Sequence, residues 1–172
     1  MSNKSVLYLV GFMGTGKTAV GRRMAAMLDW TFIDLDQEIE KTAGLTVAEI
    51  FRRHGEAHFR ALETGELRRA ALYRNSVIAT GGGACCSEEN RQIMRSTGVT
   101  VWLDAPLELL GLRCREQPEL RPLWGSPEEM EQLLERRRPF YSQAELHLSV
   151  GDGSIEDLAQ RILQLLFPGR SG

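Results

Sequence analysis

The sequence predicts a three-layer α/β/α sandwich, in which a central parallel sheet lies between two layers of helices. Short apolar runs alternate with longer segments of helical periodicity along the chain. The run VLYLV at residues 6–10 is apolar throughout, which is typical of a strand covered on both faces. Such an alternation of buried strands and helices is the pattern of a parallel sheet with crossover helices on its two sides.

Each expected strand is a short, mostly apolar run that ends at a glycine or a polar residue. In chain order, the strands are expected at residues 6–10, 31–35, 77–79, 99–103 and 146–150.

The expected helices begin at capping or turn residues and carry apolar residues at helical spacing. Thr46 with Glu49, and Ser126 with Glu129, have the spacing of a capping box. Gly55 is expected to break the helix that Thr46 begins. The helices are expected at about residues 17–28, 46–54, 56–73, 87–95, 106–113, 126–141 and 154–166.

Composition indicates one domain over residues 1–172, because no linker, repeat or low-complexity segment divides the chain. The net charge of -2 gives no strong attraction to nucleic acid or to an anionic membrane surface. The 3 cysteines lack CxxC spacing, which argues against a disulfide framework or a zinc site. We therefore expect a cytoplasmic protein with no nucleic acid and no membrane as partners. We also expect a monomer whose partners are small molecules.

The segment GFMGTGKT, residues 11–18, matches the phosphate-binding pattern GxxxxGK[ST]. Its glycines let successive backbone N–H groups face inward, and the following helix adds its positive N-terminal end. Lys17 would reach the β- and γ-phosphates of ATP, and the Thr18 hydroxyl would bind Mg²⁺. The residues predicted to bind ATP in this loop are Gly14, Thr15, Gly16, Lys17, Thr18 and Ala19.

A phosphate loop does not specify a reaction, since hydrolytic switches, motor ATPases and small-molecule kinases all use it. The chain is too short to add much to the core of this fold, which favours a compact kinase of the P-loop type. Such a kinase needs a second pocket for the phosphate acceptor.

The segment FIDLDQEIE, residues 32–40, places Asp34 and Asp36 where an apolar strand ends. Residues two apart on a strand point to the same side, so both carboxylates could converge on one ligand. Alternatively, they only solvate the strand end, because aspartate is common in loops. The preceding phosphate loop favours the ligand-binding interpretation.

Further candidates each have an ordinary structural alternative. Arg60 and Glu63 are three apart on a helix and could simply pair on its surface. The glycines at 81–83 would let a ligand approach the backbone, or would form a flexible turn. Arg121 lies in an irregular stretch that is well placed for a mobile lid over the phosphates. The arginines at 136–138 end a helix, where cations interact favourably with the helix dipole.

Together, the segments GFMGTGKTAVGRRMA, FIDLDQEIE, VAEIFRRHGEAHFRALE, VIATGGG, LRPLW and RRPFY occur in the order and spacing of shikimate kinases. The chain resembles this family from about residue 6 to residue 166. The combination of DxD, GExxFR, GGG, RPL and RxPxY with a phosphate loop makes the resemblance specific.

The resemblance implies a role for each matching residue. Asp36, the second aspartate of DxD, would hold shikimate hydroxyls, including the one phosphorylated. Asp34 would act on the magnesium side through water. Arg60 of GExxFR and Arg137 of RxPxY would grip the shikimate carboxylate, and Gly82 would donate its backbone N–H to the substrate. These residue types suit a small hydroxylated carboxylic acid.

Two regions follow from the same resemblance. The substrate-binding region would cover about residues 34–63, and the lid about residues 113–127. Arg121, the arginine of RPL, would belong to the lid and contact the ATP phosphates.

Some positions depart from the family pattern. Cys114 falls near the place where family members often carry a basic residue that stacks on adenine, so that contact could come from Arg113 or Arg115. Trp124 replaces a small or aliphatic residue after RPL and is interpreted as lid packing. The cysteines at 85–86 are expected to have no catalytic role.

The implied reaction is ATP-dependent phosphorylation of shikimate at its 3-hydroxyl, which gives shikimate 3-phosphate and ADP in aromatic amino acid biosynthesis. The implied catalytic residues are Lys17, Asp36 and Arg121, with Thr18 and Asp34 on the Mg²⁺ side. Two alternatives remain at this point: another small-molecule kinase of this fold, such as a gluconate or nucleoside monophosphate kinase, and a nucleotide-binding module without transfer activity.

Overall fold

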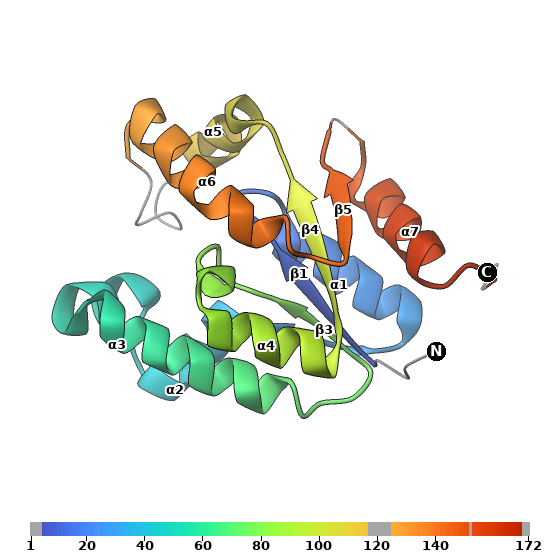
Figure 1. Ribbon diagram of the computed structural model, residues 1–172, viewed down its shortest axis with the longest axis horizontal. Coiled ribbons are helices and arrows are strands. Elements are labelled where there is room, and N and C mark those ends of the chain that lie inside the picture. Colours follow the sequence, from blue (N-terminus) through green and yellow to red (C-terminus); the bar gives the residue numbers. More distant parts are fainter. Residues whose placement is uncertain (1–4, 117–124, 152, 170–172) are drawn as a thin grey trace.

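A computed structural model of the chain describes residues 5–116, 125–151 and 153–169 (Figure 1). A single five-stranded parallel sheet has the strand order β2-β3-β1-β4-β5. Its strands are β1 (Val6–Val10), β2 (Thr31–Asp34), β3 (Ser76–Ala79), β4 (Val99–Asp104) and β5 (Leu146–Ser149).

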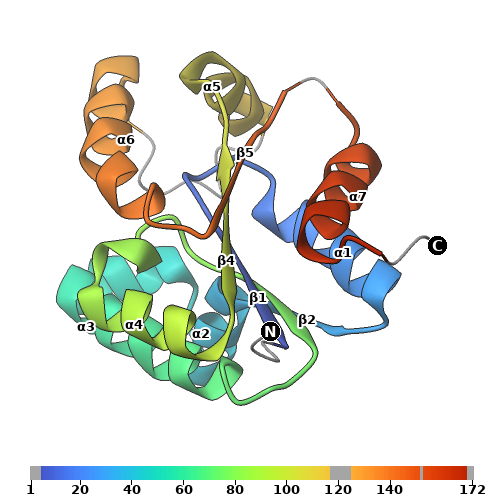
Figure 2. The same cartoon turned by 45° about the vertical axis from the view of Figure 1, so that its right-hand side comes forward.

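Helices cover both faces of this sheet, which confirms the predicted three-layer sandwich. Figure 2 shows α1 and α7 on one side, with α2, α3 and α4 on the other. The helices are α1 (Lys17–Leu28), α2 (Leu35–Ala43), α3 (Val47–Ala70), α4 (Glu88–Thr97), α5 (Leu107–Glu116), α6 (Pro127–Tyr141) and α7 (Ile155–Leu166), with a 3₁₀ turn η1 (Ala84–Cys86). None of the described helices has both the length and the apolar character needed to cross a membrane.

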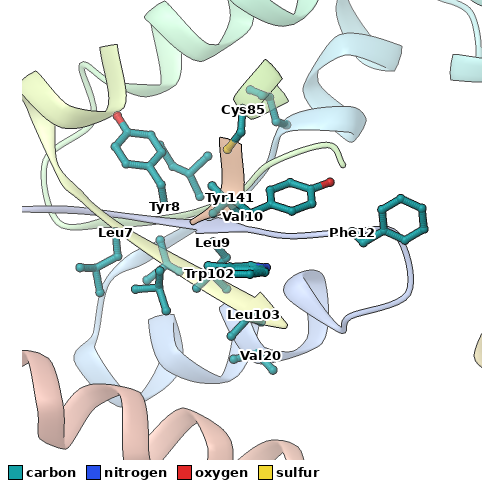
Figure 3. Close-up of a cluster of buried hydrophobic side chains, with 14 of the residues drawn as sticks. Leu7, Tyr8, Leu9, Val10, Phe12, Val20, Cys85, Trp102, Leu103 and Tyr141 are labelled. Atoms are coloured by element: carbon teal, nitrogen blue, oxygen red, sulfur yellow. The ribbon is translucent and has the colours of Figure 1, made fainter. Parts of the chain in front are cut away.

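The central strand β1 is buried on both sides, as its continuous apolar sequence predicts. Leu7 and Leu9 point toward α1, whereas Tyr8 and Val10 point to the opposite face (Figure 3). β1 pairs with β3 on one side and β4 on the other, and β3 pairs in turn with β2. The carboxyl ends of β1, β3 and β2 therefore lie next to one another, and the segments after them meet at one edge of the sheet.

The capping patterns place two helix starts correctly. Thr46 and Ser126 each form a capping box with the glutamate three residues later. Gly55 has non-helical backbone angles, φ 83 and ψ 173, so the predicted break in α3 is confirmed.

The segment after Asp34 differs from the prediction. β2 ends at Asp34, and Leu35 begins α2, for which no helix was predicted. The Asp34 carboxylate accepts a hydrogen bond from the backbone N–H of Gln37, as an N-cap residue does. Leu35 and Ile39, four residues apart, are both buried by this helix. Leu35 and Ile39 have helical spacing in the sequence, but the apolar run before them led to the prediction of a strand over residues 31–35.

Candidate active site

The phosphate loop connects β1 to α1 and depends on two glycines with left-handed backbone angles. Gly14 has φ 83 and Gly16 has φ 92, a region that L side chains rarely adopt. The Thr15 hydroxyl donates to the Phe12 carbonyl at 2.9 Å, which ties the loop to itself. The loop thus presents the N-terminal end of α1 at the carboxyl edge of the sheet, as predicted.

Lys17 is 9% exposed and lies within this loop. Its Nζ donates to the carbonyls of Gly11 and Phe12, both at 2.8 Å. The ammonium group is therefore held at the mouth of the loop, where it would meet phosphate oxygens. Ala19 lies in the first turn of α1, two residues after Lys17.

Thr18 and Asp34, the two residues that the sequence analysis assigned to the magnesium side, lie together beside the loop. The Thr18 hydroxyl donates to Asp34 Oδ2 at 2.8 Å. A hydroxyl and a carboxylate are oxygen donors of the kind that Mg²⁺ prefers, with its remaining positions taken by water and phosphate. The pair fits such an ion, although the described residues contain no group of three or more histidine, cysteine or acidic side chains that could hold one alone.

Asp36 lies in the first turn of α2, so the argument that placed it with Asp34 on one face of a strand was wrong. The capped helix start brings both carboxylates close instead, and the charge of Asp34 contributes to the environment of Asp36. Burial, followed by the nearby charges of Glu63 and Asp34, raises the pKa of Asp36 to about 6. Its Oδ1 atom is buried and has no hydrogen-bond partner among the described residues. The residue as a whole is half-buried, so its carboxylate is partly accessible to a ligand.

Arg60 and Glu63 pair as their spacing predicts, but the pair is not merely a surface feature. Arg60 donates to Glu63 Oε2 at 2.9 Å and to Glu56 at 3.1 Å. Glu63 is fully buried, with 0% exposure. Burial raises the pKa of Glu63, and the guanidinium groups of Arg60 and Arg137 oppose that change. Glu63 therefore holds Arg60 from inside the protein.

The glycine turn after β3 contacts every charged residue that the resemblance assigns to the substrate. A Cβ at Gly81 would lie 2.9 Å from Glu63 and 3.0 Å from Asp36 Oδ1. A Cβ at Gly83 would lie 2.7 Å from the guanidinium carbon of Arg60. A Cβ at either position would crowd the charged ends of these side chains, so glycine lets them approach the turn closely.

Arg137 reaches the middle glycine of the same turn from α6. It is 7% exposed, and its Nη1 would lie 3.3 Å from a Cβ at Gly82. The backbone N of Met13, in the phosphate loop, would lie 3.4 Å from the same Cβ. Two guanidinium groups, a buried carboxylate and the phosphate loop thus converge on one short turn, although they come from four separate segments.

The predicted lid at about residues 113–127 lies only partly within the described residues. Arg121 and Trp124 fall outside them. At the end of α5, Arg113 donates to the Gly14 carbonyl at 3.0 Å, whereas Arg115 is exposed. This contact places Arg113 beside the phosphate loop and favours it over Arg115 as the residue near a bound nucleotide.

Sequence reasoning missed two residues that shape the site. Glu63 was considered only as a surface partner of Arg60, and Tyr141 had no assigned role. The Tyr141 hydroxyl donates to the Gly82 carbonyl. The RxPxY pattern was the available signal for Tyr141. Cys85 is buried, and burial raises the pKa of its thiol to about 12, so it stays protonated at neutral pH.

Comparison with known proteins gives the family. The sequence model of the family described as shikimate kinase matches residues 13–167. A shikimate kinase from Cereibacter sphaeroides is 44% identical over 166 residues, which cover 95% of this chain and 83% of that protein.

Solved structures agree with the sequence comparison. The structure titled shikimate kinase from Acinetobacter baumannii in complex with shikimate superposes with a TM-score of 0.92, at 38% identity, over 98% of this chain and 96% of the other. A gluconokinase from Sinorhizobium meliloti has a TM-score of 0.60 at 14% identity, covering 99% of this chain and 100% of its own, and shares the fold alone. A family match over residues 13–167 and 44% identity to a relative over 95% of the chain together show that this protein belongs to the shikimate kinase family.

Proposed function

We propose that this protein transfers the γ-phosphate of ATP to the 3-hydroxyl of shikimate, giving shikimate 3-phosphate and ADP. The observation that carries the proposal is the convergence of Asp36, Arg60 and Arg137 on the glycine turn beside the phosphate loop. Those groups complement an acid that bears hydroxyls on one side and a carboxylate on the other. The membership of the chain in the shikimate kinase family supports the same acceptor.

Residues 14–19 would hold the ATP phosphates through backbone N–H groups and the N-terminal end of α1. Lys17 would exchange its two loop carbonyls for phosphate oxygens and neutralise charge on the transferring group. Thr18 and Asp34 would hold Mg²⁺, Asp34 through water. When bound, the ion would neutralise charge on the β- and γ-phosphates.

Asp36 would orient the acceptor hydroxyl and accept its proton. With a pKa of about 6 the carboxyl group is ionised at neutral pH and can therefore accept a proton. The hydroxyl oxygen then forms a bond to the γ-phosphorus. The bond from that phosphorus to the bridging oxygen breaks, and its electron pair leaves with ADP.

Arg60 and Arg137 would bind the shikimate carboxylate from α3 and α6, and Gly82 would donate its backbone N–H to the substrate. Two guanidinium groups suit this role because each can donate two parallel hydrogen bonds to a carboxylate. Arg121, assigned through the RPL motif alone, would contact the ATP phosphates from the lid.

The acceptor is tested by ADP release in a coupled assay, with shikimate, gluconate and nucleoside monophosphates supplied separately. We expect shikimate alone to stimulate ADP formation. Chelation with EDTA should stop the reaction, and added Mg²⁺ should restore it. Stimulation by gluconate or a monophosphate in place of shikimate would refute the proposed acceptor. Failure to transfer labelled phosphate to any of them in a single turnover would indicate a non-catalytic module.

We also propose that the enzyme acts as a monomer in the cytoplasm. All 3 cysteines are free thiols, which suits a reducing compartment. Sedimentation at assay concentration tests the monomer, and a dimer would contradict it.

A further inference from the structure

Tyr141 is the last residue of α6 and the tyrosine of the RxPxY motif. It follows Arg137 by four residues, so both side chains lie on one face of the helix. The exposed fraction is 1% for Tyr141 and 7% for Arg137. One helix face therefore delivers a phenol and a guanidinium to the same glycine turn.

The three carbonyl groups of the glycine turn are held in different ways. The Gly81 carbonyl accepts from the backbone N–H of Ala84 at 3.2 Å, and the Gly83 carbonyl accepts from that of Cys86 at 3.0 Å. Both donors belong to the 3₁₀ turn η1. The carbonyl of the middle residue, Gly82, accepts from the Tyr141 hydroxyl. A side chain from α6 thus supplies the anchor at the centre of the turn.

Such an anchor matters because glycine has no side chain to restrict its backbone angles. A run of three glycines has many accessible conformations, and an external hydrogen bond selects among them. The Tyr141 ring itself is fixed, since it packs against Trp102 with ring centroids 6.0 Å apart. In Figure 3 its hydroxyl is directed toward the Phe12 end of β1, whereas that of Tyr8 lies at the other end.

The phenol stays a donor over the whole range of assay pH. Burial raises the pKa of Tyr141 well above its ordinary value of 10.0, and the Arg137 guanidinium opposes that change only in part. The O–H group is therefore present at neutral pH.

We propose that Tyr141 is a positioning residue for the acceptor: its hydroxyl holds the Gly82 backbone so that the Gly82 N–H stays directed at the substrate. Tyr141 acts through Gly82 and is not itself assigned a contact with shikimate. The inference rests on the proposed function, which assigns the Gly82 N–H to the substrate.

The first test is Tyr141→Phe, which removes one oxygen and leaves the ring. Loss of one neutral hydrogen bond corresponds to a roughly three- to tenfold change in an equilibrium constant. We expect the KM for shikimate to rise by that factor, with kcat and the KM for ATP changed less than about twofold, because the lost interaction orients the bound substrate. An unchanged KM for shikimate overturns the inference.

Tyr8→Phe is the matched control. The Tyr8 hydroxyl is hydrogen-bonded to Thr97 Oγ1 at 2.7 Å, and Figure 3 shows it on the same face of the sheet but toward the other end of β1. Both variants lose one phenol hydrogen bond, so both should unfold at a lower temperature. Only Tyr141→Phe should raise the KM for shikimate. Equal KM changes in the two variants would show a general loss of stability and would overturn the positioning role.

The route through Gly82 is tested in an Arg137→Ala background. If Tyr141 acts through the Gly82 backbone, Tyr141→Phe still raises the KM by a similar factor when Arg137 is absent. If Tyr141→Phe no longer changes the KM for shikimate in this background, Tyr141 acts through Arg137, which would contradict the proposal. The wild-type enzyme is assayed first: inactivity with shikimate would refute the proposed function, whereas activity with an unchanged KM in Tyr141→Phe would refute the positioning role alone.

Discussion

At the scale of single residues, the buried environment of Asp36, the carboxylate proposed to act in catalysis, lowers the stability of the folded protein at neutral pH. Its pKa is displaced from an ordinary value of 3.8 to about 6, mainly by burial. The folded protein therefore binds this proton more tightly than the unfolded chain does, and the resulting stability is present below pH 3.8 and lost as the pH rises through 6. A pKa displacement of this size is equivalent to roughly 3 kcal/mol in the free energy of unfolding.

We accordingly expect Asp36→Asn to be more stable than the wild type at pH 8, by up to about 3 kcal/mol. The amide carries no charge and could donate to Glu63, whose Oε1 is buried without a partner among the described residues. The gain should shrink as the pH falls toward 4, which denaturant unfolding at several pH values would measure. A variant less stable than the wild type at pH 8 would contradict this account.

The same variant should lose phosphoryl transfer by about 100-fold or more while it still binds ATP, because an amide cannot accept the hydroxyl proton. In the wild type, kcat/KM for shikimate should fall below pH 6 as Asp36 becomes protonated. Near-normal turnover of Asp36→Asn would remove Asp36 from the mechanism.

Arg137 and Arg136 offer a second residue-scale comparison, since they are neighbours on α6 with different environments. Arg137 is buried beside the glycine turn, whereas Arg136 is exposed. Arg137→Ala should raise the KM for shikimate by about 100-fold, equivalent to roughly 3 kcal/mol for a charge-assisted hydrogen bond. Arg136→Ala should leave both KM values unchanged. Steady-state kinetics decide the matter, and equal effects would move the carboxylate site elsewhere.

At the scale of elements, α3 contains two glycines with opposite requirements. Gly55 has φ 83 and marks the kink before the segment that carries Arg60 and Glu63. Gly65 lies in the regular part of the helix, and a Cβ there would meet nothing within 4 Å. The kink in α3 therefore depends on Gly55 and not on Gly65.

Gly55→Ala and Gly65→Ala should therefore change stability in opposite directions. Alanine at Gly55 would be strained by about 1–3 kcal/mol. Alanine at Gly65 should stabilise the helix by roughly 0.5–1 kcal/mol, because it restricts the unfolded chain without strain. Thermal unfolding measures both. Destabilisation by Gly65→Ala, or none by Gly55→Ala, would contradict the backbone argument.

α2 shows why element boundaries near the site were hard to predict. The β-branched and aromatic residues before Asp34 suit a strand, and Leu35 continues their apolar run. The chain nevertheless turns into a helix at Leu35, because Asp34 caps it and Leu35 and Ile39 are buried together. Local propensity was overridden by the packing of one helical face.

At the scale of the whole molecule, most of the buried apolar side chains in the described part of the chain form one cluster that includes all three layers. β1 pairs on both sides, so neither half of the sheet is independent of it. We expect a single unfolding transition, in which the calorimetric and van 't Hoff enthalpies agree. Two resolved transitions in the calorimeter would show that the substrate-binding region unfolds separately and would contradict the single-domain prediction.

The sequence by itself determined the layers, most strand and helix positions, the phosphate loop and the family. These features depend on local patterns such as apolar runs, capping boxes and the GxxxxGK[ST] spacing, which neighbouring residues specify. Only the tertiary structure decided that Asp36 lies near Glu63, that Glu63 is buried, and that Tyr141 donates to the Gly82 carbonyl from 59 residues away. Burial and long-range hydrogen bonds arise from the packing of distant segments, which no local pattern contains.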